Sequence, residues 1–465
     1  MSPTRRSMPT HYGAEMKRII RNYEDHGMGI LHGLQKDNIQ NSWGARLTKK
    51  GQGFSVKIQL FEEEGFSAVT FTDAGTKGLT GTVYENFQDV KDSIDRGIEE
   101  ERLANFETHK NIGLNRQGQN TGGFVGQGKL ISNLNSKNYE VFYDSLRSDD
   151  EKYLINTRYF DPPNLDNDNM DIFLDNVIWD DSAKSKLQEI SKGYLKPLET
   201  SGTRIIILNP SNELINYIKS GDLLSDIEDT WWEVLLKFSI DGIFVNYEGQ
   251  EHKAQCPEFF EHAFDVDDDK VFITMRDVLQ SGKIRKAVFG FADKKLPNRY
   301  NGLTIQRANM PINQAKELYG TLYSPQLPDS HKGKFFGIIL LDSNLESAVR
   351  GLEHETHYSL DDRPRRGFQI YDAFKNAIMD FGINALKNKH GIGANRGDTN
   401  QRARTISRQT KDDVNALFRQ NGITGGIPNT QRSNFIINVK DTNNIKDPNL
   451  MGDELSVQFE IKNRT

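Results

Sequence analysis

The chain alternates between stretches in which apolar residues recur at helical spacing and stretches in which they recur at strand spacing. Apolar residues three and four positions apart predict helices over residues 28–43 and 222–238. Related patterns predict helices over residues 12–25, 84–106 and 367–387. Strands are predicted over residues 54–60, 68–72, 139–146, 153–159, 203–208, 242–247, 271–275, 287–291, 303–307, 335–341, 435–439 and 455–461. This mixture predicts an α+β fold with mixed sheets.

A run of acidic residues interrupts this pattern after the strand predicted over residues 242–247. The residues concerned are Asp265, Asp267, Asp268 and Asp269. We place a domain boundary there, which gives a first domain over residues 1–266, a smaller α+β domain over 267–395 and a polar segment with some strand patterns over 396–465. A stretch rich in Gly, Gln and Asn, residues 111–128, predicts a loop within the first domain.

Composition narrows the class of protein. The 465 residues are 36% hydrophobic and include 26 Phe and 15 Tyr, enough to build two or three packed domains. The net charge of −6 gives no overall reason to expect binding to nucleic acid or to a membrane surface. The single cysteine, Cys256, cannot form an intrachain disulfide and fits a reducing compartment. No apolar run approaches the ~20 residues of a membrane helix, and residues 1–10 lack the apolar core of a signal peptide, so we expect a cytoplasmic protein.

Two polar residues near the end of the helix predicted over 28–43 have the spacing of a metal and water site. Asp37 and Asn41 are four residues apart, so a helix projects both side chains from one face. A carboxylate and an amide placed in this way can hold a water molecule and a magnesium ion beside a triphosphate, because Mg²⁺ prefers oxygen ligands and keeps several waters. A solvated polar helix end accounts for the pattern equally well when it is taken alone.

The second candidate is an acid at the end of a predicted strand. Residues 69–79, Val-Thr-Phe-Thr-Asp-Ala-Gly-Thr-Lys-Gly-Leu, place Asp73 at the strand end and follow it with Gly75 and Gly78. Glycines allow the backbone to approach a ligand closely. An ordinary β-turn uses the same residue types, but the coincidence of strand, acid and spaced glycines favours a binding site.

A glycine-rich segment follows the predicted loop. In residues 122–129, Gly-Gly-Phe-Val-Gly-Gln-Gly-Lys, amides near Gly123, Gly126 and Gly128 can form an anion-binding nest, and Lys129 adds a compact positive charge for phosphate. The spacing differs from that of a Walker P-loop, and no strand directly precedes the segment. A flexible linker that binds nothing is the alternative.

The fourth candidate is Thr203, in a Gly-Thr pair that opens the apolar strand predicted over 203–208. Such a pair before a strand is ordinary by itself. Its position after the glycine-rich segment supports Thr203 as a candidate site residue.

Taken in this order, the four segments resemble the nucleotide-binding boxes of the GHKL ATPases, the superfamily of gyrase, MutL, the heat-shock-90 chaperone and the MORC proteins, and particularly its MORC- and MutL-like members. The resemblance covers roughly the first half of the chain. It implies a Bergerat-type ATPase sandwich, in which a mixed sheet carries helices on one face, followed by a smaller α+β transducer-like domain. It also implies ATP and Mg²⁺ as cofactors.

The resemblance assigns a role to each candidate. Asp37 is the general base that polarises the attacking water, and Asn41 is the magnesium ligand. Asp73 accepts a hydrogen bond from the exocyclic amine of adenine, and Thr203 supports that carboxylate through water. The residues assigned to nucleotide binding are Asn41, Asp73, Gly75, Gly78, Gly123, Gly126, Gly128, Lys129 and Thr203.

Three features depart from the family pattern. Asp37 stands where Glu is usual, Gly44 stands where Asp is usual, and one extra residue precedes Gly78. The shorter acid predicts slow turnover. In the second domain, transducers of the family send one lysine to the γ-phosphate, which makes Lys332 or Lys334 the candidate here, with Lys334 chosen as the catalytic one. A solvated loop lysine is the alternative for either residue.

The resemblance implies a nucleotide-gated switch. ATP and Mg²⁺ order the loop over residues 111–128, two protomers form a homodimer through their ATPase domains, and hydrolysis releases them. DNA or a partner protein is the candidate client, in a DNA-associated process or in antiviral defence in a microbe. The alternatives are a chaperone-type clamp on protein clients and a nucleotide-sensing module with little hydrolysis. A histidine kinase is disfavoured, because no dimerisation helix with a phospho-accepting histidine precedes Asp37.

Overall fold

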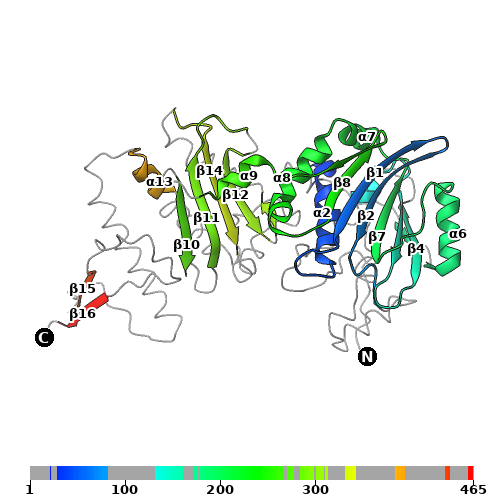
Figure 1. The fold of residues 1–465 in the computed structure, drawn as a ribbon, viewed down its shortest axis with the longest axis horizontal. Coiled ribbons are helices and arrows are strands. Elements are labelled where there is room, and N and C mark those ends of the chain that lie inside the picture. The colour runs from blue at the N-terminus through cyan, green and yellow to red at the C-terminus, as the bar shows by residue number, and fades with distance from the viewer. Residues whose placement is uncertain are drawn as a thin grey trace, which may run out of the picture. The chain divides into compact units, whose positions relative to one another are not determined.

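The computed structural model divides into two compact units, Met1–Ile392 and Gly393–Thr465 (Figure 1). The residues that it describes are Arg21, 29–81, 131–160, 172–174, 177–265, 270–276, 283–297, 300–307, 309–312, 330–341, 383–392, 435–439 and 459–463.

The larger unit contains a nine-stranded mixed sheet. Its strands are β1 (Ser55–Glu63), β2 (Phe66–Ala74), β3 (Glu140–Leu146), β4 (Tyr153–Phe160), β5 (Ile172–Leu174), β6 (Ile178–Trp179), β7 (Gly202–Leu208), β8 (Gly242–Tyr247) and β9 (Gln250–Lys253). They are ordered β5-β4-β3-β7-β2-β1-β8-β9, and β6 also pairs with β4. Neighbouring strands run antiparallel, except that β1 and β8 run parallel. The two strands that carry Asp73 and Thr203, β2 and β7, therefore lie side by side at the centre of the sheet.

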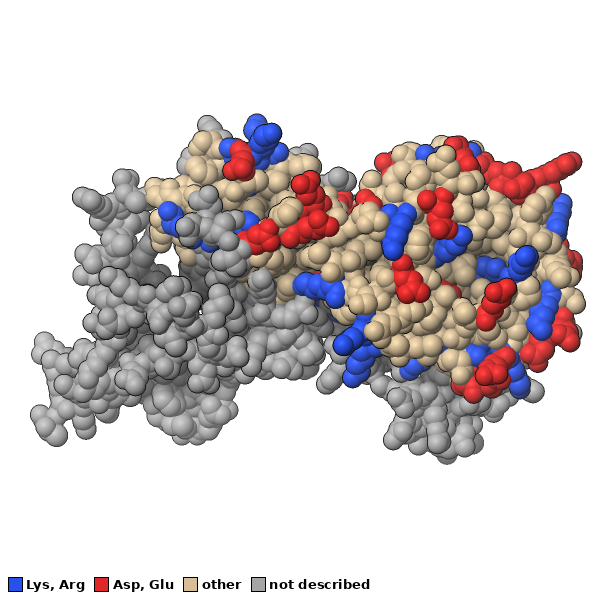
Figure 2. All heavy atoms as spheres, viewed as in Figure 1, with Lys and Arg blue, Asp and Glu red and all other residues tan. Residues whose placement is uncertain are grey.

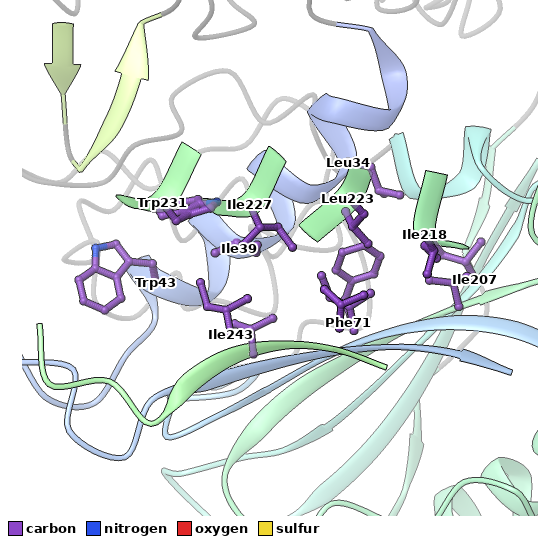
Figure 3. Packing of buried hydrophobic residues seen from close by; sticks show 14 of the residues in the cluster. Leu34, Ile39, Trp43, Phe71, Ile207, Ile218, Leu223, Ile227, Trp231 and Ile243 are labelled. Atoms are coloured by element: carbon purple, nitrogen blue, oxygen red, sulfur yellow. The ribbon is translucent and has the colours of Figure 1, made fainter. Parts of the chain in front are cut away.

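Three helices cover one face of this sheet: α2 (Ile30–Gly44), α7 (Asn212–Lys219) and α8 (Asp222–Lys237). Figure 3 shows apolar side chains of these helices, such as Leu34 and Trp231, above side chains of the strands, such as Ile243. Each of these three side chains is at most 1% exposed. Ser211 is the N-cap of α7, and its hydroxyl accepts a hydrogen bond from the amide of Leu214. Packing against a common core, rather than helix propensity alone, therefore fixes this layer.

A further helix, α6 (Asp180–Ser191), covers part of the opposite face. Successive residues of a strand point to opposite faces. Val69 of β2 therefore joins the core below α2 and α8, whereas the preceding Ala68 packs with Ala183 and Leu187 of α6. The family resemblance implies helices on one face of the sheet only, whereas α6 covers part of the other face.

A five-stranded sheet completes the described part of the larger unit. Its strands are β10 (Val271–Arg276), β11 (Lys283–Phe291), β12 (Gly302–Arg307), β13 (Met310–Ile312) and β14 (Phe335–Leu341), in the order β10-β11-β14-β12-β13. The pair β12–β14 is parallel and the other pairs are antiparallel. All seven residues of β14 are buried, which explains the unbroken apolar run Phe-Phe-Gly-Ile-Ile-Leu-Leu of this central strand. The helix α13 (Asn384–Lys389) lies later in the same unit.

The helix α8 packs against both sheets of the larger unit. Trp231 belongs to the core of the nine-stranded sheet, and its indole donates to Gln35 Oε1 of α2 at 3.2 Å. The next residue, Trp232, packs with Val288 of β11 and stacks on Phe260 of α9 (Glu258–Ala263), with ring centroids 4.4 Å apart. Both tryptophans are 0% exposed. Two adjacent positions of one helix thus serve two cores.

The smaller unit contains the antiparallel strands β15 (Phe435–Val439) and β16 (Phe459–Asn463). These correspond to the strands predicted over 435–439 and 455–461, the second of which begins and ends later than predicted.

The α+β prediction is confirmed, and so are the predicted helices that became α2 and α8. The patterns missed several short elements: α6, α7, α9, β5, β6, β9 and β13. The helix α6, for example, buries only Ala183, Leu187 and Ser191, so its sequence is mostly polar. The predictions over residues 12–25 (apart from Arg21), 84–106 and 111–128, and most of that over 367–387, lie outside the described residues.

The surface of the described residues carries charges of both signs. On the face drawn in Figure 2, Asp and Glu side chains are interspersed with Lys and Arg. Within the described ranges no helix is long and apolar enough to cross a membrane.

Candidate functional site

The helix α2 carries the first pair of candidates, Asp37 and Asn41. Asp37 is 7% exposed and interacts with other parts of the protein, whereas Asn41 is exposed one turn later. The helix therefore leads from the interior to the surface along the face that bears both side chains. Asn41 is exposed to solvent, and Asp37 lies beneath the surface.

Asp73 lies near the end of β2, opposite Val56 of β1, and is 7% exposed. Its Oδ1 accepts hydrogen bonds from Thr76 Oγ1 at 2.5 Å and from the amide of Thr203 at 2.8 Å. Its Oδ2 accepts one from Ser42 Oγ at 2.8 Å. The donors come from α2, from the turn after β2 and from β7, so three separate segments meet at this one carboxylate.

Burial raises the pKa of Asp73, because desolvation disfavours the charged form, while hydrogen bonds from Thr76, Ser42 and Thr203 act in the opposite direction. Shifted pKa values of this kind occur at functional sites and also in buried structural networks.

The glycines around Asp73 allow backbone segments to approach more closely than any side chain would permit. Gly75 has φ 69°, and a Cβ there would lie 2.1 Å from the carbonyl oxygen of Gly53. Gly78 has φ 68°, and a Cβ there would lie 2.6 Å from the carbonyl oxygen of Leu146. Gly202 passes so close to Asp73 that a Cβ would lie 2.2 Å from its carbonyl oxygen. The two glycines predicted after Asp73 therefore have a steric reason to be there.

Ser145 of β3 links these segments from the side. Its hydroxyl donates to the carbonyl of Gly202 at 2.7 Å and accepts from the amide of Leu79 at 2.9 Å. The hydroxyl of Thr203 lies 3.3 Å from Ser145 Oγ. Thr203 thus reaches Asp73 through its amide, and the threonine hydroxyl that contacts Asp73 belongs to Thr76.

A buried ion pair fixes β3 and β7 beside this network. Arg204 Nε and Nη2 donate to the two carboxylate oxygens of Asp144 at 2.9 and 2.7 Å, and the hydroxyl of Tyr153 also donates to Asp144. Burial lowers the pKa of Arg204, but Asp144 and Tyr153 together raise it more, so the net shift is upward. Asp144 and Arg204 are partners in the strand register, so the pair holds Thr203 in place next to Asp73.

Backbone hydrogen bonds tie the end of α2 to the turn after Asp73. The amide of Lys77 donates to the carbonyl of Ala45 at 2.9 Å, and the amide of Leu47 donates to the carbonyl of Gly75 at 3.0 Å. The guanidinium of Arg46 lies over the ring of Trp43, 3.9 Å from its centroid. The α2 segment and the Asp73 turn, 28 or more residues apart in sequence, are therefore braced together by their main chains.

Five predicted site residues remain, of which the structure describes only Lys334. Gly123, Gly126, Gly128 and Lys129 lie outside the described residues. Lys334 immediately precedes β14, where its carbonyl accepts from the amide of Ala292 at 2.9 Å and its own amide donates to His331. Its proposed role at a γ-phosphate stays a prediction.

Sequence reasoning missed three hydroxyl residues: Ser42, Thr76 and Ser145. Thr76 carried a signal, because a hydroxyl three residues after an Asp at a strand end can close a turn onto the carboxylate. Ser42 also carried one, since it follows Asn41 and sits within the same helical turn. Ser145 lies in an ordinary strand sequence, and its position between β7 and the turn after β2 is visible only in the fold.

The Asp73 network and the exposed Asn41 fit a purine amine and a magnesium ion. Asp73 accepts three hydrogen bonds, and a carboxylate offers about four acceptor positions. One position thus remains for an amine. The exposed Asn41 offers an oxygen of the kind that Mg²⁺ prefers. Among the described residues no group of three or more His, Cys, Asp or Glu side chains is arranged to hold a metal, so such an ion would take further ligands from phosphate and water.

Comparisons with known proteins give little independent information. No family model matches the chain, and no curated protein matches it. Among solved structures, the ATPase region of Saccharomyces cerevisiae topoisomerase II bound to ICRF-187 (dexrazoxane) matches with a TM-score of 0.37 and 11% identity over 77% of this chain and 85% of that one. A second structure of the same ATPase region matches with a TM-score of 0.37 and 11% identity, over 78% and 84%.

Proposed function

We propose that the chain binds ATP with Mg²⁺ and hydrolyses it slowly, with Asp73 as the residue that recognises adenine. The observation that carries the proposal is the Asp73 network: a buried carboxylate held by Ser42, Thr76 and the Thr203 amide, with one acceptor position left. Adenine presents an exocyclic amine as donor, which such a position fits. The order of the motifs along the chain supports the same reading.

Asp37 and Asn41 supply the chemistry in this proposal. The carboxylate of Asp37 orients and polarises a water molecule for attack on the γ-phosphate. The amide oxygen of Asn41 binds the magnesium ion, which when bound neutralises charge on the phosphate oxygens. Asp37 reaches less far than the Glu usual at this position, and its burial restricts it further, which supports slow turnover.

The glycine-rich segment over 122–129 and Lys129 are proposed to close over the phosphates. In the same proposal Lys334 supplies a positive charge from the start of β14. ATP binding leads to a homodimer. The dimer acts on DNA or on a partner protein, for instance in antiviral defence. Electrostatic stabilisation by such cations is the usual main contribution to phosphoryl transfer.

A nucleotide-sensing protein with little hydrolysis is the second candidate. The observation in its favour is that Asp37 is 7% exposed and already engaged within the protein. A general base has to come within hydrogen-bond reach of the water that it activates.

The test is calorimetric ATP binding and phosphate release by the purified full chain with Mg²⁺, beside Asp37→Ala and Asp73→Asn. We expect Asp37→Ala to retain binding and to lose turnover by about 10²-fold or more. We expect Asp73→Asn to weaken ATP binding by about tenfold or more, because its amide presents a donor to the adenine amine. Asp37→Glu, which restores the longer acid, should raise turnover.

The exposed Asp181→Asn on α6 serves as the matched control, since it makes the same chemical change far from the site in sequence and on the opposite face of the sheet. Binding without turnover in the unaltered protein would select the nucleotide-sensing alternative. Absence of any ATP binding would refute the proposal.

A further inference from the structure

The side chain of Gln35 is buried between α2 and α8, and both ends of its amide form hydrogen bonds. Its Oε1 accepts a hydrogen bond from Trp231 Nε1 at 3.2 Å, and its Nε2 donates to Thr230 Oγ1 at 3.1 Å. Gln35 and Trp231 are 0% exposed, and Thr230 is 2% exposed. One side chain of α2 therefore binds two consecutive residues of α8 out of contact with water.

These two hydrogen bonds restrict the rotation of α2 about its own axis. Leu34 and Ile39 also attach α2 to the core, but through apolar contacts. Attraction between apolar surfaces is not directional, whereas a hydrogen bond weakens steeply when its angle changes. A second polar contact between the two helices, from His32 Nδ1 to Asp226 Oδ2 at 3.1 Å, joins side chains that are 18% and 37% exposed. The buried Gln35 amide is the stronger constraint of the two, because water does not compete for its partners.

Asp37 projects from the opposite side of the same helix. An α-helix turns by about 100° per residue, so residues two positions apart project in nearly opposite directions. Gln35 contacts α8, and Asp37 therefore projects away from α8. Side chains of a helix end about 5 Å from its axis, so a rotation of about 10° moves a carboxylate by about 1 Å. Misplacement of a catalytic group by about 1 Å is enough to lower a rate by about 10²-fold.

We propose that Gln35 is a positioning residue for hydrolysis, whose amide holds α2 against α8 in the rotation that brings Asp37 to the attacking water. The inference rests on the proposed function, in which Asp37 polarises that water. It separates two tasks on one helix. The Gln35 amide sets the rotation of α2, and Asp37 acts on the water.

ATP affinity depends much less on this rotation. Two of the three hydrogen-bond donors to Asp73, the Thr76 hydroxyl and the Thr203 amide, lie outside α2. Base recognition at Asp73 therefore survives a small rotation of the helix. Loss of the Gln35 amide is expected to lower kcat and to leave the Kd for ATP nearly unchanged.

The test measures phosphate release and calorimetric ATP binding by the purified full chain with Mg²⁺, beside Gln35→Met. Methionine is similar to glutamine in length and volume but lacks the amide. We expect kcat to fall about tenfold or more while the Kd for ATP changes by less than about twofold. Thr230→Val removes one of the two hydrogen bonds and keeps the branched shape of the side chain. It should lower kcat by a smaller factor, and it serves as the test if Gln35→Met does not fold.

Thermal unfolding distinguishes positioning from a general loss of structure. The double variant Gln35→Met/Thr230→Val removes both partners of one hydrogen bond, so part of the Tm that Gln35→Met loses should be regained. Its kcat should stay low, because the directional contact is still missing. Leu187→Ala is the matched control. Leu187 is 0% exposed and packs under α6 on the other face of the sheet, so its truncation should lower Tm and leave kcat unchanged.

The outcomes separate this inference from the proposed function. An unchanged kcat in Gln35→Met, or in Thr230→Val if the first variant does not fold, overturns the role of Gln35 while the proposed hydrolysis stands. A kcat that returns together with Tm in the double variant, or a Kd that rises as much as kcat falls, has the same consequence. Absence of turnover in the unaltered protein overturns the proposed hydrolysis and this inference with it.

Discussion

At the scale of single residues, burial and hydrogen bonding shift the pKa of Asp73 in opposite directions. Its side chain is 7% exposed, and burial raises its pKa while three donors oppose the rise. Because the folded pKa lies above that of the unfolded chain, ionised Asp73 weakens folding at neutral pH. This cost disappears as the pH falls below the pKa of the unfolded chain. In the proposed function, nucleotide binding would have the opposite dependence, since the adenine amine would donate to the ionised carboxylate.

We therefore predict that ATP affinity falls as the pH is lowered through the raised pKa of Asp73, at a higher pH than an ordinary aspartate would give. Calorimetric titration with ATP at a series of acid pH values measures this change in affinity. Inorganic tripolyphosphate, which lacks the base, reports the pH dependence of the phosphate part alone. An ATP profile that parallels the tripolyphosphate profile would contradict the role of Asp73.

At the scale of elements, the turn after β2 depends on glycine in two separate ways. Gly75 needs its left-handed backbone, φ 69°, and it needs the space that a Cβ would take from Gly53. Gly249, in the turn between β8 and β9, has φ 72° but nothing within 4 Å of the position of a Cβ. Alanine would strain the backbone at both positions, but it would overlap with a neighbouring atom only at position 75.

Gly249→Ala should cost about 1–2 kcal/mol of unfolding free energy, the price of the left-handed conformation. Gly75→Ala should cost more, by about 1–3 kcal/mol for the overlap, and should also weaken ATP binding because the Asp73 turn must shift. Denaturant unfolding measures the two differences. Equal losses in the two variants would show that the turn can move away from Gly53 freely.

At the scale of the whole larger unit, α8 supports two cores. Trp231 packs into the core between the helices and the nine-stranded sheet, and Trp232 packs with Phe260 and with β11 and β14 of the second sheet. The hydroxyl of Tyr300 adds a hydrogen bond to Asp229 of α8 at 2.7 Å. A change that displaces α8 is therefore expected to destabilise both sheets, one through Trp231 and the other through Trp232.

Trp231→Ala and Trp232→Ala should each cost about 3–5 kcal/mol, as large buried aromatic truncations do. Amide hydrogen exchange should localise the losses: β1 and β8 in Trp231→Ala, and β11 and β14 in Trp232→Ala. Identical exchange patterns in the two variants would mean that the sheets open only as one cooperative unit.

The sequence by itself determined the fold class, the main strands and the positions of Asp37, Asn41, Asp73, Gly75 and Gly78 on a helix, a strand end and a turn. Periodicity and turn chemistry are local properties, so local sequence contains them. It did not reveal the short, mostly polar elements such as α6, whose few buried positions give too little periodicity to recognise.

Only the tertiary structure decided what surrounds Asp73. Ser42, Thr76 and the Thr203 amide come from segments as far as 161 residues apart along the chain, and their meeting depends on the order of β2 and β7 in the sheet and on how α2 packs over it. Hydrogen bonds between distant segments leave no periodic trace in the sequence. The number of acceptor positions that Asp73 keeps for a ligand is therefore a property of the folded chain.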